Sequence, residues 1–341
     1  MTYGEIIKRN LELSPVTWWP NYAYHYTDVR NAIGILQSSK LYSRIKAQAK
    51  MVMKNDNASR QVIDMTMSDA TSFVRFYFRP LTPTQYYNEG YKHPQLRYDG
   101  DINANISVPV FFTFRLEKLL LNSKTCFSNL SQAGYGSSCW SGEYAFENLE
   151  FKKIYSYGFT DDETRKYRHA EILYPYEYDI DESLEFILCR NKIERETLLN
   201  LLYDTDLKAF YKYKDKIKVC RRDMFEKNGL YLDDILFNFE TLTIVFADSY
   251  DKKTYDTKQI ERLKLQNLRR IPIIISIDWK SGKEKCFAMH LESEIDYIKP
   301  SPITLKNLPH VPKAKTLSIK ITIEGKLIAY KIFNLEQMQI I

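Results

Sequence analysis

One isolated carboxylate is the residue of this sequence that most needs an explanation. Glu171 lies in residues 167–174, Tyr-Arg-His-Ala-Glu-Ile-Leu-Tyr, a segment with the apolar character of a buried strand. A charged residue in such a segment needs a reason, and a functional role is the first interpretation. Alternatively, strand alternation points Glu171 to solvent while Ala170 and Ile172 face inward. The residues alone leave both interpretations open.

Several common catalytic signatures are missing from the sequence. There is no P-loop, no zincin motif and no nucleophile elbow. Gly134-Tyr135-Gly136 lies in a polar stretch without the strand and helix of a dinucleotide-binding unit. The five histidines are scattered and share no metal-ligand spacing. We therefore expect a mechanism that uses no metal.

The composition is that of a folded protein with many aromatic residues. The 341 residues are 44% hydrophobic and 27% charged, with 26 Tyr, 18 Phe and a formal net charge of +6. Aromatic rings stack on exposed bases and cations follow phosphates, so this mixture suits single-stranded nucleic acid. An AT-rich genome would also raise Tyr and Lys without any function. Composition can therefore only support a case made elsewhere.

Two further features concern the environment of the chain. No apolar run approaches the roughly 20 residues that span a bilayer, and the first ten residues carry charges where a signal peptide is apolar. We expect a cytoplasmic protein that does not enter membranes. The five cysteines are odd in number and widely spaced, which favours reduced, mostly structural thiols.

The pattern of elements predicts an α+β domain followed by a region of different character. A strand over residues 23–26 leads into a helix capped by Thr27 or Asp28, and further strands are predicted at 72–78, 108–114, 170–174 and 184–189. A helix at 194–204, a basic stretch at 212–222 and several strands follow, including a hairpin around Glu324-Gly325. We expect one domain over residues 1–190 and an accessory α+β region of unknown role over 191–341.

Three motifs occur together in an order that resembles one family. They are His25-Tyr26-Thr27 with Asn31, the aromatic block of residues 73–83, and Arg168-x-Ala170-Glu171-Ile172-Leu173. Together they resemble the DarT family, whose members are NAD-dependent DNA ADP-ribosyltransferases of toxin and antitoxin pairs. The resemblance covers roughly residues 20–180. It implies an ADP-ribosyltransferase-like split β-sandwich with flanking helices, here followed by a strand-rich C-terminal elaboration.

The resemblance also implies roles for individual residues. Glu171 would stabilise the positive charge on the ribose as nicotinamide leaves, and Arg60 would grip the NAD diphosphate, with Arg44 and Arg75 as alternatives. Residues placed against NAD are His25, Tyr26, Thr27, Asn31 and Tyr77. His25 and Thr27 have a second interpretation as caps of the following helix.

For the second substrate, the resemblance points to the Gly- and Ser-rich segment of residues 128–142. Tyr135 and Trp140 there, and Arg168, are candidates for contact with nucleic acid, although a hydrophobic flap is an alternative use of the segment. Residues 79–85 depart from the family's proline-rich run, which leaves substrate selection open.

The function expected from the resemblance is transfer of ADP-ribose to bases of single-stranded DNA, as a toxin or phage-defence effector. RNA bases or protein side chains are alternative targets, and a module that binds nucleic acid without catalysis is a rival. The resemblance further implies an antitoxin partner of the macrodomain type. No cofactor other than NAD is expected.

Overall fold

The computed structural model describes residues 1–55, 68–97, 105–132, 138–220, 222–248, 261 and 269–338. A seven-stranded sheet organises the first part of the chain, in the order β5-β6-β3-β1-β4-β8-β9. Its neighbouring strands are antiparallel except for β8 and β9, which are parallel. In chain order the strands are β1 (Tyr22–Asp28), β3 (Phe73–Tyr77), β4 (Pro109–Arg115), β5 (Cys126–Ser128), β6 (Glu171–Pro175), β8 (Leu184–Cys189) and β9 (Ile217–Val219).

The unit of β1 and α2 (Val29–Ser38) follows the predicted pattern. The Asp28 side chain accepts a hydrogen bond from the backbone N–H of Arg30 at 2.9 Å and caps the helix, as Asp28 or Thr27 was expected to do. The apolar stripe of α2 is buried at Val29, Ala32, Ile33 and Leu36. The strand, the cap and the helix predicted here are confirmed.

Strand β3 carries the aromatic block and divides its side chains between two faces. Val74 and Phe76 are buried in the core, whereas Phe73, Arg75 and Tyr77 alternate with them on the other face. The neighbouring strand β6 is buried at its first four positions, so its apolar character reflects its place inside the sheet.

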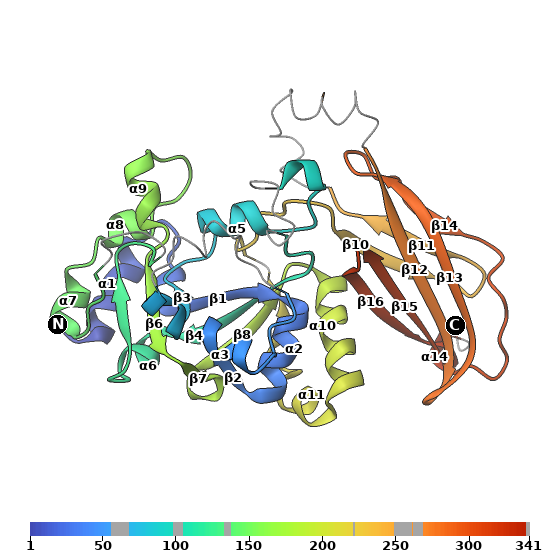
Figure 1. Ribbon diagram of the computed structural model, residues 1–341, viewed down its shortest axis with the longest axis horizontal. Helices are drawn as coiled ribbons and strands as arrows, with labels where there is room; N and C mark the ends of the chain where they lie inside the picture. Colours follow the sequence, from blue (N-terminus) through green and yellow to red (C-terminus); the bar gives the residue numbers. More distant parts are fainter. Residues whose placement is uncertain are drawn as a thin grey trace.

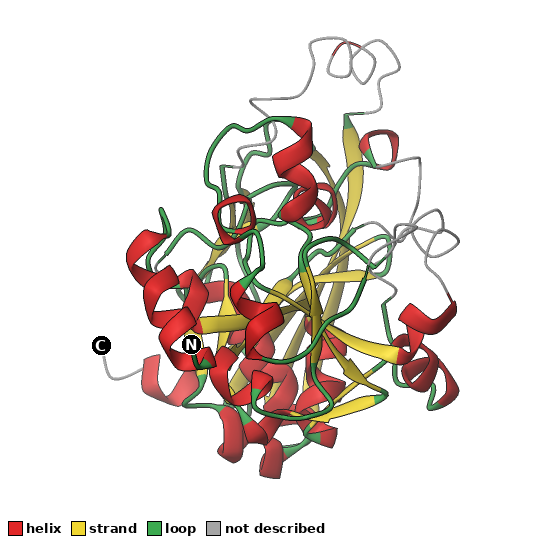
Figure 2. Cartoon of the chain, turned by 90° about the vertical axis from the view of Figure 1, so that its left-hand side faces the viewer, coloured by secondary structure: helices red, strands yellow, loops and turns green. Residues whose placement is uncertain are grey.

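Short helices surround these strands (Figure 2). They are α1 (Tyr3–Leu13), α3 (Arg44–Ala49), α5 (Pro83–Asn88), α6 (Leu116–Leu120), α7 (Glu143–Glu147), α8 (Phe151–Ile154) and α9 (Asp162–Tyr167). A small second sheet pairs β2 (Lys40–Tyr42) with β7 (Glu177–Asp179). Single turns of 3₁₀ helix lie at Trp19–Asn21, Ser68–Ser72, Pro94–Leu96 and Ile180–Glu182.

The core of the first sheet continues beyond residue 190. Helices α10 (Lys192–Thr205) and α11 (Leu207–Tyr213) contribute Leu198, Leu202 and Tyr213 to it. The cluster continues to Phe225 and also includes Leu327 and Tyr330. Strand β9 completes the sheet at residues 217–219. The sheet and its core therefore include about 35 residues that follow the expected boundary.

The C-terminal part contains two further sheets around a separate isoleucine-rich core. One sheet has three strands, β10 (Leu232–Phe237), β11 (Leu242–Phe246) and β14 (Ile303–Leu305). The other has the order β13-β12-β15-β16, with β12 (Arg270–Ser281), β13 (Glu284–Asp296), β15 (Thr316–Ile323) and β16 (Lys326–Asn334), and α14 (Leu335–Met338) follows it. Strands β15 and β16 form the hairpin predicted at Glu324-Gly325, where both residues have positive φ.

Helix α10 lies between the two parts of the molecule (Figure 1). Asn200 on α10 donates a hydrogen bond to the backbone oxygen of Tyr330 on β16, and the Thr197 hydroxyl accepts one from the Tyr330 N–H. Nearby, the buried Arg190 guanidinium pairs with the carboxylates of Glu194 and Glu89 and lies over the Tyr231 ring. Across the described ranges, no helix has the length and apolarity needed to cross a membrane.

Candidate functional site

Glu171 begins β6 and is almost completely buried, with 1% of its side-chain surface exposed. The alternative that it points to solvent is therefore wrong. Arg75 on the adjacent strand β3 donates hydrogen bonds to it from Nε to Oε2 at 3.0 Å and from Nη2 to Oε1 at 2.5 Å. Burial opposes the charge on Arg75, but the Glu171 carboxylate outweighs it and raises the pKa of the guanidinium.

The register of the sheet explains why these two side chains meet. Tyr77 pairs directly with Glu171, so Arg75 lies two residues away on the same face of β3. Ser128 on β5 faces Glu171 from the other side. Glu171 is therefore in the interior of the sheet, with a strand on each side.

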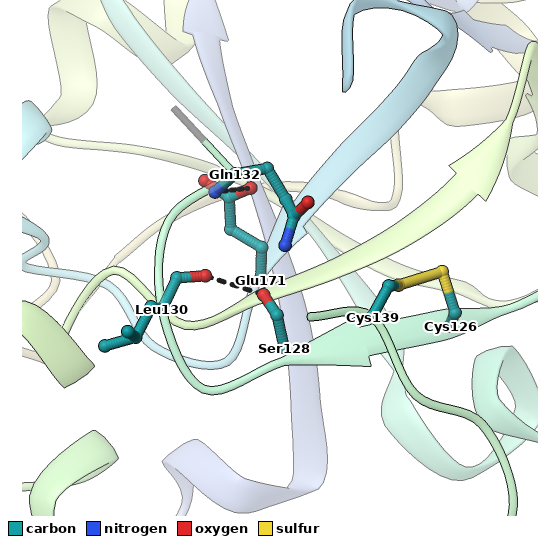
Figure 3. The surroundings of a disulfide bond; sticks show 6 residues. All are labelled: Cys126, Ser128, Leu130, Gln132, Cys139 and Glu171. Atoms are coloured by element: carbon teal, nitrogen blue, oxygen red, sulfur yellow. Dashed lines mark hydrogen bonds between the residues drawn. A yellow bond between two sulfur atoms is a disulfide. The ribbon is translucent and has the colours of Figure 1, made fainter. Parts of the chain in front are cut away.

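The chain that follows β5 covers the carboxylate. The Ser131 hydroxyl donates to Glu171 Oε1 at 3.4 Å, and the backbone N–H of Gln132 donates to Oε2 at 3.3 Å. Figure 3 shows the Gln132 side chain beside the Glu171 carboxylate, and the Ser128 hydroxyl donating to the carbonyl oxygen of Leu130 at 2.6 Å. The carboxylate thus accepts both charged and neutral hydrogen bonds.

A cavity of about 460 Å³ opens beside this pair. Arg75 and Ser131, which both contact the Glu171 carboxylate, form part of its lining. All five residues expected to contact NAD also line it, and they are His25, Tyr26, Thr27, Asn31 and Tyr77. Residues as far apart in the sequence as His25 and Ser131 therefore converge on one concave site.

His25 stands in the middle of the sheet, where β1 passes between β3 and β4. Its Nδ1 lies 3.0 Å from the backbone oxygen of Arg75, and since a carbonyl oxygen only accepts, Nδ1 carries the proton. Burial lowers the pKa of His25, which favours the neutral ring. Nε2 is then a hydrogen-bond acceptor, and the cap of α2 is Asp28, not His25.

Two other lining residues have distinct environments. Burial and the negative charge of Glu171 raise the pKa of Tyr77 to about 12, so its hydroxyl keeps its proton. The Asn31 amide donates to the Asn55 backbone oxygen at 2.7 Å and accepts from the N–H groups of Lys54 and Asn55. Asn31 therefore fixes the segment that forms one wall of the cavity.

The expected nucleic-acid residues are not gathered at the cavity. Trp140 is 40% exposed and forms a bridge to Phe127 on β5. Arg168 donates to the Ser156 hydroxyl at 3.0 Å and to the Gly158 oxygen at 2.8 Å. Among the described residues, neither is part of the cavity lining. Arg60 and Tyr135 lie outside the residues that the structure describes.

Sequence reasoning missed or undervalued three features of the site. Arg75 was only an alternative to Arg60, although its place between Phe73 and Tyr77 in an alternating strand was a usable signal. His169 also lines the cavity, and its position two residues before Glu171 could have indicated this.

The third feature is a disulfide between Cys126 and Cys139 (Figure 3). The expectation of reduced thiols is wrong for these two cysteines. They are 13 positions apart, but the backbone bridge between Phe127 and Trp140 brings their Cα atoms to 5.9 Å. The described thiols of Cys189, Cys220 and Cys286 are free.

A buried carboxylate held by an arginine on the next strand, beside a cavity, is an arrangement suited to glycosyl transfer. The family model described as "ssDNA thymidine ADP-ribosyltransferase, DarT" matches residues 24–222, more than half of the chain. The chain belongs to the DarT family. No curated protein matches it.

Solved structures of this family resemble the chain at low identity. A Thermus sp. 2.9 DarT in complex with ADP-ribosylated ssDNA is 18% identical, with a TM-score of 0.48 over 60% of this chain and 96% of that one. The same Thermus protein in complex with NAD+ gives a TM-score of 0.45 over 60% and 98%. A Thermosipho africanus DarTG in complex with ADP-ribose is 14% identical, with a TM-score of 0.42 over 56% of this chain and 51% of that one.

Proposed function

We propose that this chain transfers ADP-ribose from NAD to a thymine base of single-stranded DNA and that Glu171 acts at the reacting ribose carbon. The observation that carries the proposal is the Glu171 carboxylate, buried beside a cavity whose lining includes Arg75 and all five residues expected to contact NAD. Membership of a family described as thymidine ADP-ribosyltransferases supports the choice of substrate.

The chemistry is a substitution at the ribose C1′ atom of NAD. The bond to nicotinamide breaks and its electron pair leaves with nicotinamide, while a base nitrogen forms the new bond and gives up its proton to the solvent. Positive charge develops on the ribose in between, and a nearby carboxylate stabilises it. Arg75 keeps the Glu171 carboxylate in one orientation through two hydrogen bonds.

The lining of the cavity suits a nucleotide co-substrate. His25 offers an acceptor nitrogen, and Tyr26 and Tyr77 offer flat rings. Arg44 at the start of α3 supplies a positive charge to the same lining. We propose Arg44, one of the alternatives to Arg60, for the diphosphate, because its guanidinium belongs to the cavity lining and can donate paired hydrogen bonds to phosphate oxygens.

We also propose a division of labour along the chain. The catalytic domain would comprise the seven-stranded sheet and its helices, and the C-terminal sheets would form an accessory region. Strand β9 belongs to the first sheet, and the core of that sheet includes Phe225. We therefore place the boundary between the catalytic domain and the accessory region after about residue 225 and not near residue 190. We further propose that the protein acts as a toxin in the cytoplasm and has an antitoxin partner of the macrodomain type. Trp140 and Arg168 would contact DNA beyond the target base.

The experiment uses NAD labelled in its adenylate part and follows the label. The unmodified protein is incubated separately with single-stranded oligonucleotides of one base type, with matching RNA and with a protein mixture. Label on thymine-containing DNA supports the proposal. Label that appears only on RNA or protein would overturn the assignment of DNA as the substrate. If NAD is not consumed with any of these substrates, a protein that binds nucleic acid without catalysis would be the better account.

A further inference from the structure

His169 is a cavity-lining residue to which the proposed chemistry gives no role. It lies in the turn between α9 and β6, two residues before Glu171, and shares the lining with Arg75 and Ser131. Its ring is half-buried and makes no hydrogen bond to any described residue. A ring that lines a cavity without a partner is suited to a hydrogen bond with a substrate.

The charge state of the ring restricts what it can bind. Burial and the positive charge of Arg75 lower the pKa of His169 to about 4, so the imidazole is neutral near pH 7. A neutral imidazole has one N–H donor and one acceptor nitrogen. It is a poor match for a diphosphate, which favours cations, and a weak base for removing a proton.

Gln132 provides a second polar group of the same kind. Its backbone N–H holds Glu171 Oε2 at 3.3 Å, which brings the residue against the carboxylate (Figure 3). Its side-chain Nε2 is buried and finds no hydrogen-bond partner among the described residues. His169 thus lines the cavity together with Arg75, and Gln132 lies against the Glu171 carboxylate.

We propose that His169 and Gln132 position the acceptor base by donating hydrogen bonds to its carbonyl oxygens. This inference rests on the proposed function and names residues that recognise its second substrate. The base is the neutral, planar reactant, and such bases are recognised by hydrogen bonds to their edges. Thymine has two carbonyl oxygens, whereas cytosine replaces one of them with an amino donor that would face a donor of the protein.

The experiment compares His169→Phe and His169→Gln with the unmodified protein. His169→Phe keeps a flat ring without hydrogen bonds, and His169→Gln restores a donor. We expect His169→Phe to raise the KM for a thymine oligonucleotide roughly tenfold or more, because it leaves a base carbonyl without its partner. It should also reduce the preference for thymine over cytosine, and His169→Gln should recover part of both.

Two further measurements separate the possible outcomes. Hydrolysis of NAD without DNA should fall less than transfer in His169→Phe, and His290→Ala, on strand β13, should behave as the unmodified protein in both reactions. An unchanged KM and base preference in His169→Phe, or an equal loss of NAD hydrolysis and transfer, would overturn the inference. Failure of the unmodified protein to label thymine DNA would instead refute the proposed function, and this inference with it.

Discussion

Arg75 and Glu171 are 96 positions apart in the chain, yet they form a two-hydrogen-bond ion pair across adjacent strands. A second pair has the same geometry, since Arg115 on β4 donates from Nε and Nη2 to the Glu185 carboxylate on β8 at 3.0 and 2.7 Å. The pairs differ in burial, because Glu185 is 29% exposed and Glu171 only 1%. The second pair is therefore an internal control for the first.

Removal of Arg75 should destabilise the protein through the carboxylate left behind. We expect Arg75→Met to lower the free energy of unfolding by about 3 kcal/mol, since Glu171 would stay buried without its charged partner. Arg115→Met should cost less than about 1 kcal/mol because its partner is partly solvated. Denaturant titration measures both. Adding Glu171→Gln to Arg75→Met should recover part of the lost free energy of unfolding, because the unpaired charge is removed. If the double variant is no more stable than Arg75→Met, the ion pair does not stabilise the protein in this way.

The buried helix cap Asp28 should make stability depend on pH. Burial raises the pKa of Asp28 from 3.8 to about 6, so the folded state binds the proton more tightly and stability falls as pH rises from about 4 to about 6. Asp28→Asn keeps the cap and removes the charge. Relative to the unmodified protein, the free energy of unfolding of Asp28→Asn should rise by up to about 3 kcal/mol between pH 4 and pH 7. Chemical denaturation at the two pH values measures this difference.

The exposed cap of α9 gives the opposite sign. Hydrogen bonds from the Thr164 backbone and hydroxyl lower the pKa of Asp161, so its contribution is present at neutral pH and lost as pH falls. The free energy of unfolding of Asp161→Asn, relative to that of the unmodified protein, should therefore fall as the pH rises from acid to neutral. The same sign for both variants would contradict the assignment of Asp28 as a buried, destabilising charge.

The disulfide should stabilise the segment that covers Glu171. It closes the chain between Cys126 and Cys139, and a loop of about 15 residues is worth about 3 kcal/mol in the chain-entropy treatment. Cys126→Ser should lose about that amount, and a reductant should lower the stability of the unmodified protein but not of the variant. Cys286→Ser, which removes a free thiol on β13, is the control. Thermal unfolding that is insensitive to reductant would refute this role.

The local parts of the fold were predictable from the sequence because short-range physics determines them. Asp28 and the stripe of Val29 to Leu36 predicted the start and the buried face of α2, and Glu324-Gly325 predicted the β15–β16 hairpin. The part of the first sheet beyond residue 190 was not predictable. Strand β9 has three residues and joins β8 in parallel, a pairing that no local pattern indicates.

The residues of the candidate site that belong to a sequence motif were predictable. The pairs that form between neighbouring strands were not. Glu171 and His25 were found through their motifs, and both lie at or beside the cavity. The Arg75 and Glu171 pair depends on the register of β3 against β6, which the sequence does not reveal. For Cys126 and Cys139, pairing depends on the bridge between Phe127 and Trp140, so spacing alone favoured free thiols.

The central claim is that the Glu171 carboxylate carries out the chemistry, and one paired measurement tests it most directly. Transfer of labelled ADP-ribose from NAD to a thymine oligonucleotide is compared between Glu171→Gln and Glu185→Gln. Each variant removes the charge of a carboxylate that is paired with an arginine on the adjacent strand. We expect Glu171→Gln to lose at least about a hundredfold in kcat and Glu185→Gln to keep nearly full activity. Equal activity of the two variants would contradict the account.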